Sequence, residues 1–188
     1  MAKIIQDQLI QQLESRIEQH LKDTIYSLQN LPEEVLLRPA ADGGWSIAQC
    51  LEHLNTYGDY YLPQIQQGLA QASPTPTVFF QSSWLGSYFT KMMEPTTGKK
   101  KFKAFKGHIP AVQLDGHATV ARFIQQQEEL LSYVKQAKSV NLNKIRIPIS
   151  ITRLIRLKLG DVFQFIIAHD ERHLQQAFRN LTDYTKIP

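Results

Sequence analysis

The sequence is poor in cysteine, with Cys50 alone among 188 residues. One cysteine excludes a disulfide within the chain and is typical of a reducing compartment, so we expect a cytoplasmic protein. No apolar run approaches the roughly 18 residues that a membrane-spanning helix needs. The first residues mix charge with apolar side chains and lack the apolar core of a signal peptide. From these absences we do not expect a secreted protein held together by disulfides, and we do not expect a membrane partner.

The remaining composition is that of a globular protein, with 43% hydrophobic and 20% charged residues. Its length favours a single domain that spans residues 1–188 and contains an insertion at about residues 73–114. The net charge is +4, and the densest basic cluster lies within Lys99–Lys106. Because we find no zinc-finger or RNA-binding signature beside this cluster, we interpret it as a solvated loop and do not expect a nucleic-acid partner.

Apolar residues recur at helical spacing in four long segments. Ser46 and Gln49 form a capping box at the start of the second segment, while Asp115 and Asp161 are expected to be N-caps. The pattern therefore predicts an all-α four-helix bundle. The expected helices are Ile4–Leu31, Ile47 to about Leu69, Gly116–Ala137 and Gly160–Leu181.

The connections between these segments are long and broken by proline and glycine. Phe79–Met93 is expected to hold one short amphipathic helix, which acts either as a flap packed on the bundle or as a lid over a pocket. Ile145–Ile151 predicts a short extended piece, although Pro148 argues against a central strand. Since the connection before Gly116 is long enough to cross the bundle, an up-down-up-down order is not assured.

Two histidines on the last segment, His169 and His173, are four residues apart and therefore share one helical face. Apolar residues precede them on the same stripe, which points both imidazoles inward. Neutral imidazoles that converge in a bundle bind a divalent cation when another helix supplies a third ligand, and His53 is our candidate. The alternative is that these histidines only line the core or a cleft. We expect packing or surface roles for His20 and His117.

The residues around these histidines form a paired motif. Trp45-Ser46-x-x-Gln49-x-x-x-His53-Leu54 is followed much later by His169-Asp-Glu-Arg-His173-Leu-Gln-Gln176. This pair resembles the DinB-like superfamily, which includes YfiT-like metal-dependent hydrolases. The resemblance implies a four-helix bundle that binds zinc, nickel, manganese or iron through His53, His169 and His173. It also implies a supporting or packing role for Gln176, and a homodimer.

The expected function is that of an enzyme acting on a small-molecule substrate. A cation held by three neutral nitrogens lowers the pKa of a bound water, for hydrolysis, or of a low-molecular-weight thiol, for S-transfer. Helical facing makes Tyr57 and Tyr60 the candidate catalytic residues, with packing as the alternative for each. For Cys50 we expect a small buried side chain rather than a nucleophile. The alternative function is a non-catalytic ligand-binding or stress-related protein of the same fold.

Overall fold

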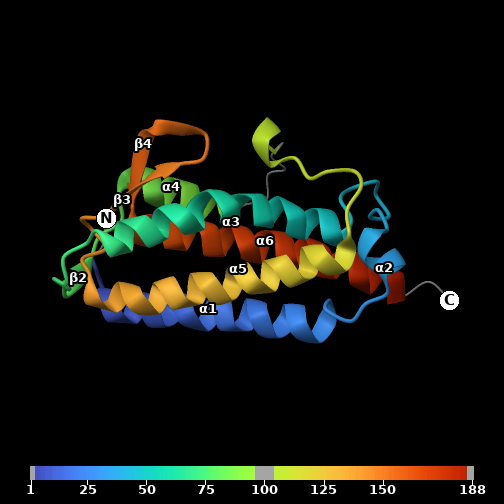
Figure 1. Cartoon of the computed structure of the whole chain (residues 1–188), viewed down its shortest axis with the longest axis horizontal. Coiled ribbons are helices and arrows are strands. Elements are labelled where there is room, and N and C mark those ends of the chain that lie inside the picture. The colour runs from blue at the N-terminus through green and yellow to red at the C-terminus, as the bar shows by residue number, and fades with distance from the viewer. Residues whose placement is uncertain (1–2, 96–103, 186–188) are drawn as a thin grey trace.

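The computed structural model describes residues 3–95 and 104–185 and forms a bundle of four long helices (Figure 1). This arrangement confirms the all-α prediction. The helices are α1 (Gln6–Ser27), α3 (Ile47–Ala70), α5 (Gly116–Gln136) and α6 (Leu159–Thr185). No helix in the described ranges is long and apolar enough to cross a membrane.

The order of the helices around the bundle differs from their order in the chain. α3 packs against α5 and α6, and α1 packs against the same two helices from the other side. The neighbouring helices α3 and α5 run in the same direction, so the chain between them must return along the whole bundle (Figure 1). A simple up-down-up-down order therefore does not apply, and α3 and α6 meet along their lengths.

Short elements decorate the ends and one side of the bundle. Antiparallel strands β1 (Ile4–Ile5) and β2 (Phe79–Phe80) form one sheet, and β3 (Arg146–Ile149) and β4 (Thr152–Lys158) form a hairpin. Pro148 is accommodated in β3 because both strands of a two-stranded sheet are edges. The remaining short helices are α2 (Glu33–Leu37), α4 (Trp84–Met93), and the 3₁₀ turns η1 (Lys106–His108) and η2 (Ala137–Ser139).

The capping signals in the sequence were right at two helices and wrong at a third. Ser46 and Gln49 make both bonds of the capping box on α3, and Asp115 accepts from the backbone of α5. Asp161, however, lies inside the first turn of α6, which begins at Leu159. Its carboxylate instead accepts from the backbone nitrogen and hydroxyl of Ser83, at 3.0 and 2.7 Å. It therefore anchors the segment before α4 and is not an N-cap.

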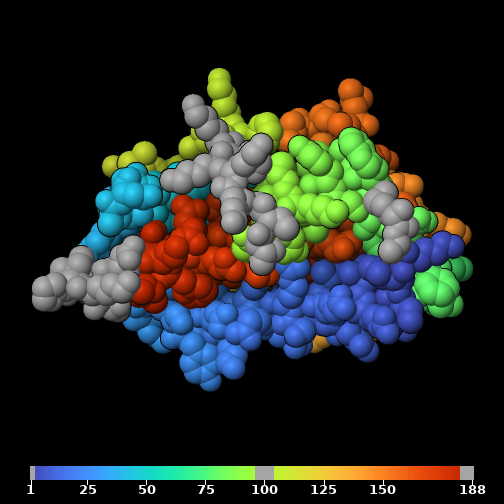
Figure 2. Space-filling view, turned by 180° about the vertical axis from the view of Figure 1, so that it is seen from behind, coloured from blue at the N-terminus to red at the C-terminus, as the bar shows by residue number. Residues whose placement is uncertain are grey.

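The insertion after α3 carries α4, which packs along α6 and beside the β3–β4 hairpin. From behind, α4 is seen as a green patch between α1 and the orange hairpin (Figure 2). The first helix also starts later than predicted, at Gln6, because Ile4 and Ile5 pair with β2. Of the predicted basic cluster, Lys106 lies in η1, and residues 99–103 lie outside the described residues.

Candidate metal centre

Three histidines converge where α3 faces α6. His53 lies in the second turn of α3, and His169 and His173 lie one turn apart on α6. One ring nitrogen from each lies within 4.8 Å of the others, and the Nε2 atoms of His53 and His169 are 3.2 Å apart. Two nitrogens bound to one tetrahedral zinc ion at about 2.0–2.1 Å would be about 3.3 Å apart. The spacing of His53 and His169 therefore fits a shared cation, and a ligand atom of His173 lies within 4.8 Å of both.

The outer nitrogens of two of these rings are held by hydrogen bonds. The Nδ1 of His53 lies 2.6 Å from the backbone oxygen of His108, and the Nδ1 of His173 lies 3.1 Å from Oε1 of Gln176. Because both oxygens can only accept, each Nδ1 carries the hydrogen, and each Nε2 keeps its lone pair. Such outer contacts are typical of metal-binding histidines. The buried Nδ1 of His169 has no partner within the described residues.

Burial keeps all three imidazoles neutral at pH 7. Loss of hydration lowers the pKa of His53 to about 4 and that of His173 to about 3. For His169 burial is again the largest cause, followed by the neighbouring His173 and His53, and its pKa falls well below the usual value. Neutral imidazole is the form that binds a metal ion, so the donor set suits a divalent cation.

Aromatic rings enclose the cluster. The Trp45 ring lies 4.9 Å from the His53 ring and 5.9 Å from the His173 ring, centroid to centroid. The Tyr57 ring lies 4.4 Å from the His169 ring, and Phe165 stacks on His169 at 5.9 Å with an interplanar angle of 7°. Among these rings His53 and His169 are each only 3% exposed, and electrostatic interactions at buried groups are stronger than in water.

Comparison with known proteins shows the family and the fold of the chain. The sequence model of the DinB superfamily matches residues 16–177, a range that includes all three histidines. The chain belongs to the DinB superfamily. Among solved structures it is similar to YfiT from Bacillus subtilis, a probable metal-dependent hydrolase with an unusual four-helix bundle topology. The TM-score is 0.55 at 15% identity, over 96% of this chain and 87% of that one. No functionally curated protein matches the sequence.

His108 is a residue beside the histidine cluster that the sequence did not reveal. The hydroxyl of Thr56 donates to the backbone oxygen of His53 at 2.7 Å, so it accepts from Nδ1 of His108 at 2.8 Å. The His108 ring then stacks on Tyr57 at 3.9 Å, and its Nε2 is left as an acceptor. Burial also lowers the pKa of His108.

The two candidate tyrosines have different surroundings. Tyr57 lies beside the histidines, and burial raises the pKa of its hydroxyl to about 12, so that hydroxyl is a donor at neutral pH. Tyr60 lies nearly a turn further along α3, where its hydroxyl donates to the backbone oxygen of Ile149 at 3.0 Å. The structure therefore brings Tyr57 to the three histidines and directs the hydroxyl of Tyr60 to the hairpin.

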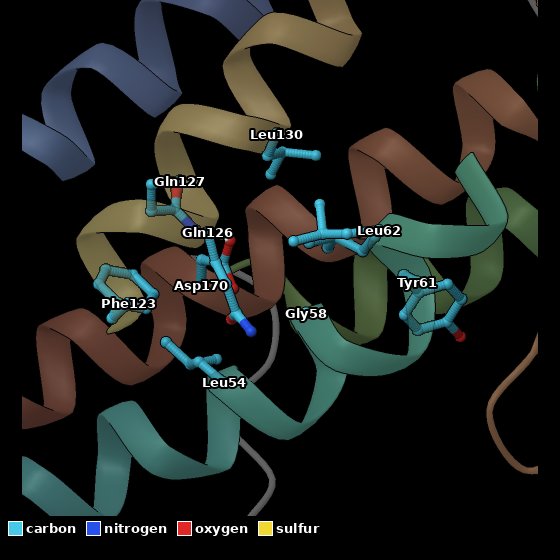
Figure 3. Close-up of a pocket in the computed structure, with 10 residues that line it drawn as sticks. Leu54, Gly58, Tyr61, Leu62, Phe123, Gln126, Gln127, Leu130 and Asp170 are labelled. Carbon is cyan, nitrogen blue, oxygen red and sulfur yellow. Dashed lines mark hydrogen bonds between the residues drawn. The ribbon is translucent and has the colours of Figure 1, made fainter. Parts of the chain in front are cut away.

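Other polar residues near the motif lie away from the cluster. Asp170 follows His169 but lies in a narrow pocket between α3, α5 and α6, where Nε2 of Gln127 donates to it at 2.8 Å (Figure 3). Burial raises the pKa of Asp170 to about 7. Cys50 is fully buried and its pKa rises to about 12, which suits packing rather than nucleophilic attack.

Proposed function

We propose that this protein is a metal-dependent enzyme that uses His53, His169 and His173 to hold one divalent cation. The observation that carries the proposal is the convergence of three neutral ring nitrogens within 4.8 Å. The outer hydrogen bonds of His53 and His173 support it, because they hold each ring through Nδ1 and leave its Nε2 as the metal-binding atom. A bound cation would act as a Lewis acid and lower the pKa of a water, for hydrolysis, or of a low-molecular-weight thiol, for transfer.

The chain's own residues supply proton donors and acceptors beside this point. The Tyr57 hydroxyl, whose pKa is about 12, stays protonated and can donate a hydrogen bond to negative charge that develops on a substrate. His108 is neutral and has an unprotonated Nε2, so it can accept a proton. We assign these two residues the catalytic roles. Because the hydroxyl of Tyr60 donates to the backbone oxygen of Ile149, its role in the proposal is to hold the β3–β4 hairpin against α3.

Metal analysis tests the proposal directly. We expect about one zinc, nickel, manganese or iron ion per chain in purified or reconstituted wild-type protein, and loss of that ion in the His53→Ala and His169→Ala variants. His117→Ala is the matched control, because that side chain is half exposed and bonds the backbone of Leu31 outside the cluster. A stoichiometric ion should also raise the melting temperature until a chelator removes it. No stoichiometric ion after reconstitution would overturn the proposal.

The choice between hydrolysis and thiol transfer needs a second measurement. Metal-loaded protein would be given a p-nitrophenyl ester alone, and then monobromobimane together with a low-molecular-weight thiol. Metal-dependent release of p-nitrophenol without thiol indicates a hydrolase, whereas metal-dependent conjugation of bimane indicates a transferase. The His53→Ala variant gives the background rate of each reaction.

A homodimer and a cytoplasmic location complete the proposal. The free Cys50 supports a reducing compartment. Two large aromatic side chains are exposed on α4, Trp84 at 73% and Tyr88 at 54%, and they offer a surface for a second copy. Sedimentation velocity at two protein concentrations would test the dimer, and a single monomeric species at both would exclude it.

A further inference from the structure

An apolar pocket lies against the rings that surround His169 and is formed by elements far apart in the sequence. α3, α4, α6 and the β3–β4 hairpin all contribute walls, and the empty volume is about 380 Å³, counting the space at its mouth. Because this figure includes open solvent, the enclosed part of the pocket is much smaller and offers room for a short apolar group, not for a whole ligand.

The pocket and the candidate metal centre share two side chains. Tyr57 and Phe165 line the pocket, and the same two rings contact His169 at 4.4 and 5.9 Å. Beyond them, the ring of Phe89 packs edge-on to Phe165 at 6.2 Å. Tyr57 and Phe165 therefore bring one wall of the pocket against His169.

The described side chains that line the pocket carry no charge and offer few polar atoms. Apart from Tyr57, the polar side chains are Tyr61 and Ser150, and the Tyr61 hydroxyl accepts from the Ser150 backbone nitrogen at 3.1 Å. Met92 and Met93 add flexible thioether side chains, which adapt to ligands of different shape. A charged group placed here would lose its hydration without a partner, so the pocket selects apolar groups.

The α4 wall is held in place at both ends. At its start, the hydroxyl and backbone nitrogen of Ser83 donate to the buried carboxylate of Asp161. At its end, Glu94 forms an ion pair with Arg16 at 3.0 Å. Because Arg16 also pairs with Glu171 of α6 at 2.6 Å, the end of α4 is connected to two bundle helices. The pocket is thus preformed, which reduces the entropy lost when a ligand binds.

From these contacts we infer that the pocket binds the apolar alkyl or aryl group of the substrate while the substrate's reactive end lies among His53, His169 and His173. The inference rests on the proposed function for the position of the reactive end. The expected substrates are small molecules with a polar reactive end and an uncharged hydrocarbon end.

A chain-length series of alkyl hydroxamates tests the inference by binding, without any assumption about the reaction. Hydroxamates chelate metal ions, so their common end marks the metal site, and their alkyl chains report on the pocket. Titration calorimetry of zinc-loaded protein should show affinity rising about threefold to fourfold per methylene from acetohydroxamate to hexanohydroxamate. The same series would be titrated into metal-free protein.

Charge placed at the pocket should abolish this dependence on chain length. Ile151 and Phe105 line the pocket from different segments and are 51% and 53% exposed, so lysine is tolerated by the fold at either position. We expect Ile151→Lys and Phe105→Lys to bind acetohydroxamate like the wild type but to gain little from longer chains. Leu154→Lys, on the same hairpin and 95% exposed, is the matched control and should keep the full dependence.

The possible failures can be told apart. Zinc-dependent binding whose strength does not change with chain length would overturn the pocket and leave the proposed function standing. A full dependence on chain length with equal affinity in zinc-loaded and metal-free protein would support the pocket and overturn the metal function. Loss of the dependence in Leu154→Lys as well as in Ile151→Lys would also overturn the assignment of the pocket.

Discussion

Replacing Gln176 with leucine is expected to weaken zinc binding by about 10- to 100-fold, the cost typical of losing a residue that supports a metal-binding histidine. Gln176 lies on α6 with its Oε1 3.1 Å from Nδ1 of His173. Leucine has a similar size and no acceptor, so the N–H of the ring loses its partner and the ring is free to turn. The change corresponds to about 1.4–2.7 kcal/mol of binding free energy.

Two variants make this measurement specific. Gln175→Leu makes the same chemical change at the preceding residue, whose side chain is exposed, and should leave zinc affinity unchanged. Gln176→Glu restores an acceptor and should retain wild-type affinity or exceed it, because a carboxylate makes the imidazole a better ligand. These variants separate the hydrogen bond from the effects of surface hydrophobicity.

The assay is competition for zinc against a chromophoric chelator at pH 7.5, with the melting temperature of each metal-free variant measured in parallel. Equal melting temperatures of the metal-free proteins would show that a change in affinity does not arise from a weakened fold. If Gln176→Leu and Gln175→Leu bind zinc equally well, the reasoning that Gln176 orients a metal ligand is refuted.

Three further outcomes are expected. Gly86→Ala should destabilise the protein by about 1–3 kcal/mol in urea unfolding, because an added Cβ would overlap the buried carboxylate of Asp161. Gly107→Ala is the control and should cost little, since the space around Gly107 is open. Equal effects of the two substitutions would contradict the packing of α4. Burial lowers the pKa of His20 from 6.5 to about 4, so the unfolded chain takes up its proton first as pH falls through this window. The free energy of unfolding should therefore drop by about 3 kcal/mol as the pH falls from 6.5 to about 4. The difference in unfolding free energy between wild type and His20→Leu should change over the same pH range. If the two proteins lose stability in parallel, His20 makes no such contribution. The protein should not be retained on duplex DNA at about 50 mM salt, and retention that weakens steeply with added salt would instead assign nucleic-acid binding to Lys99–Lys106.

The predictions from sequence succeeded where neighbouring residues decide the outcome. The capping box of Ser46 involves residues three apart, and the shared face of His169 and His173 follows from one helical turn. Asp161 shows the limit of such reasoning. A carboxylate near a helix start is an equally good acceptor for a distant loop, and Ser83, 78 residues earlier in the chain, provides the donors.

The surroundings of the candidate site show the same division. Tyr57 and Tyr60 both follow the His53 face, but four residues rise about 6 Å along a helix and seven rise about 10 Å, so only Tyr57 stays beside the histidines. His108 had no signal in the sequence, because it acts through its backbone oxygen and through a ring placed by the turn η1. Neither contact depends on spacing along the chain.

By itself, the sequence determined four amphipathic helices, two of their caps and the three histidines that we propose as ligands. These features depend on helical periodicity, or on a motif within one or two helices. Only the tertiary structure decided that α3 and α5 run parallel (Figure 1), that α4 is held against α6, and that Tyr57 and Phe165 both contact His169 and line an apolar pocket. The physical reason is that these contacts join segments far apart in the chain, and close packing of side chains in three dimensions selects them.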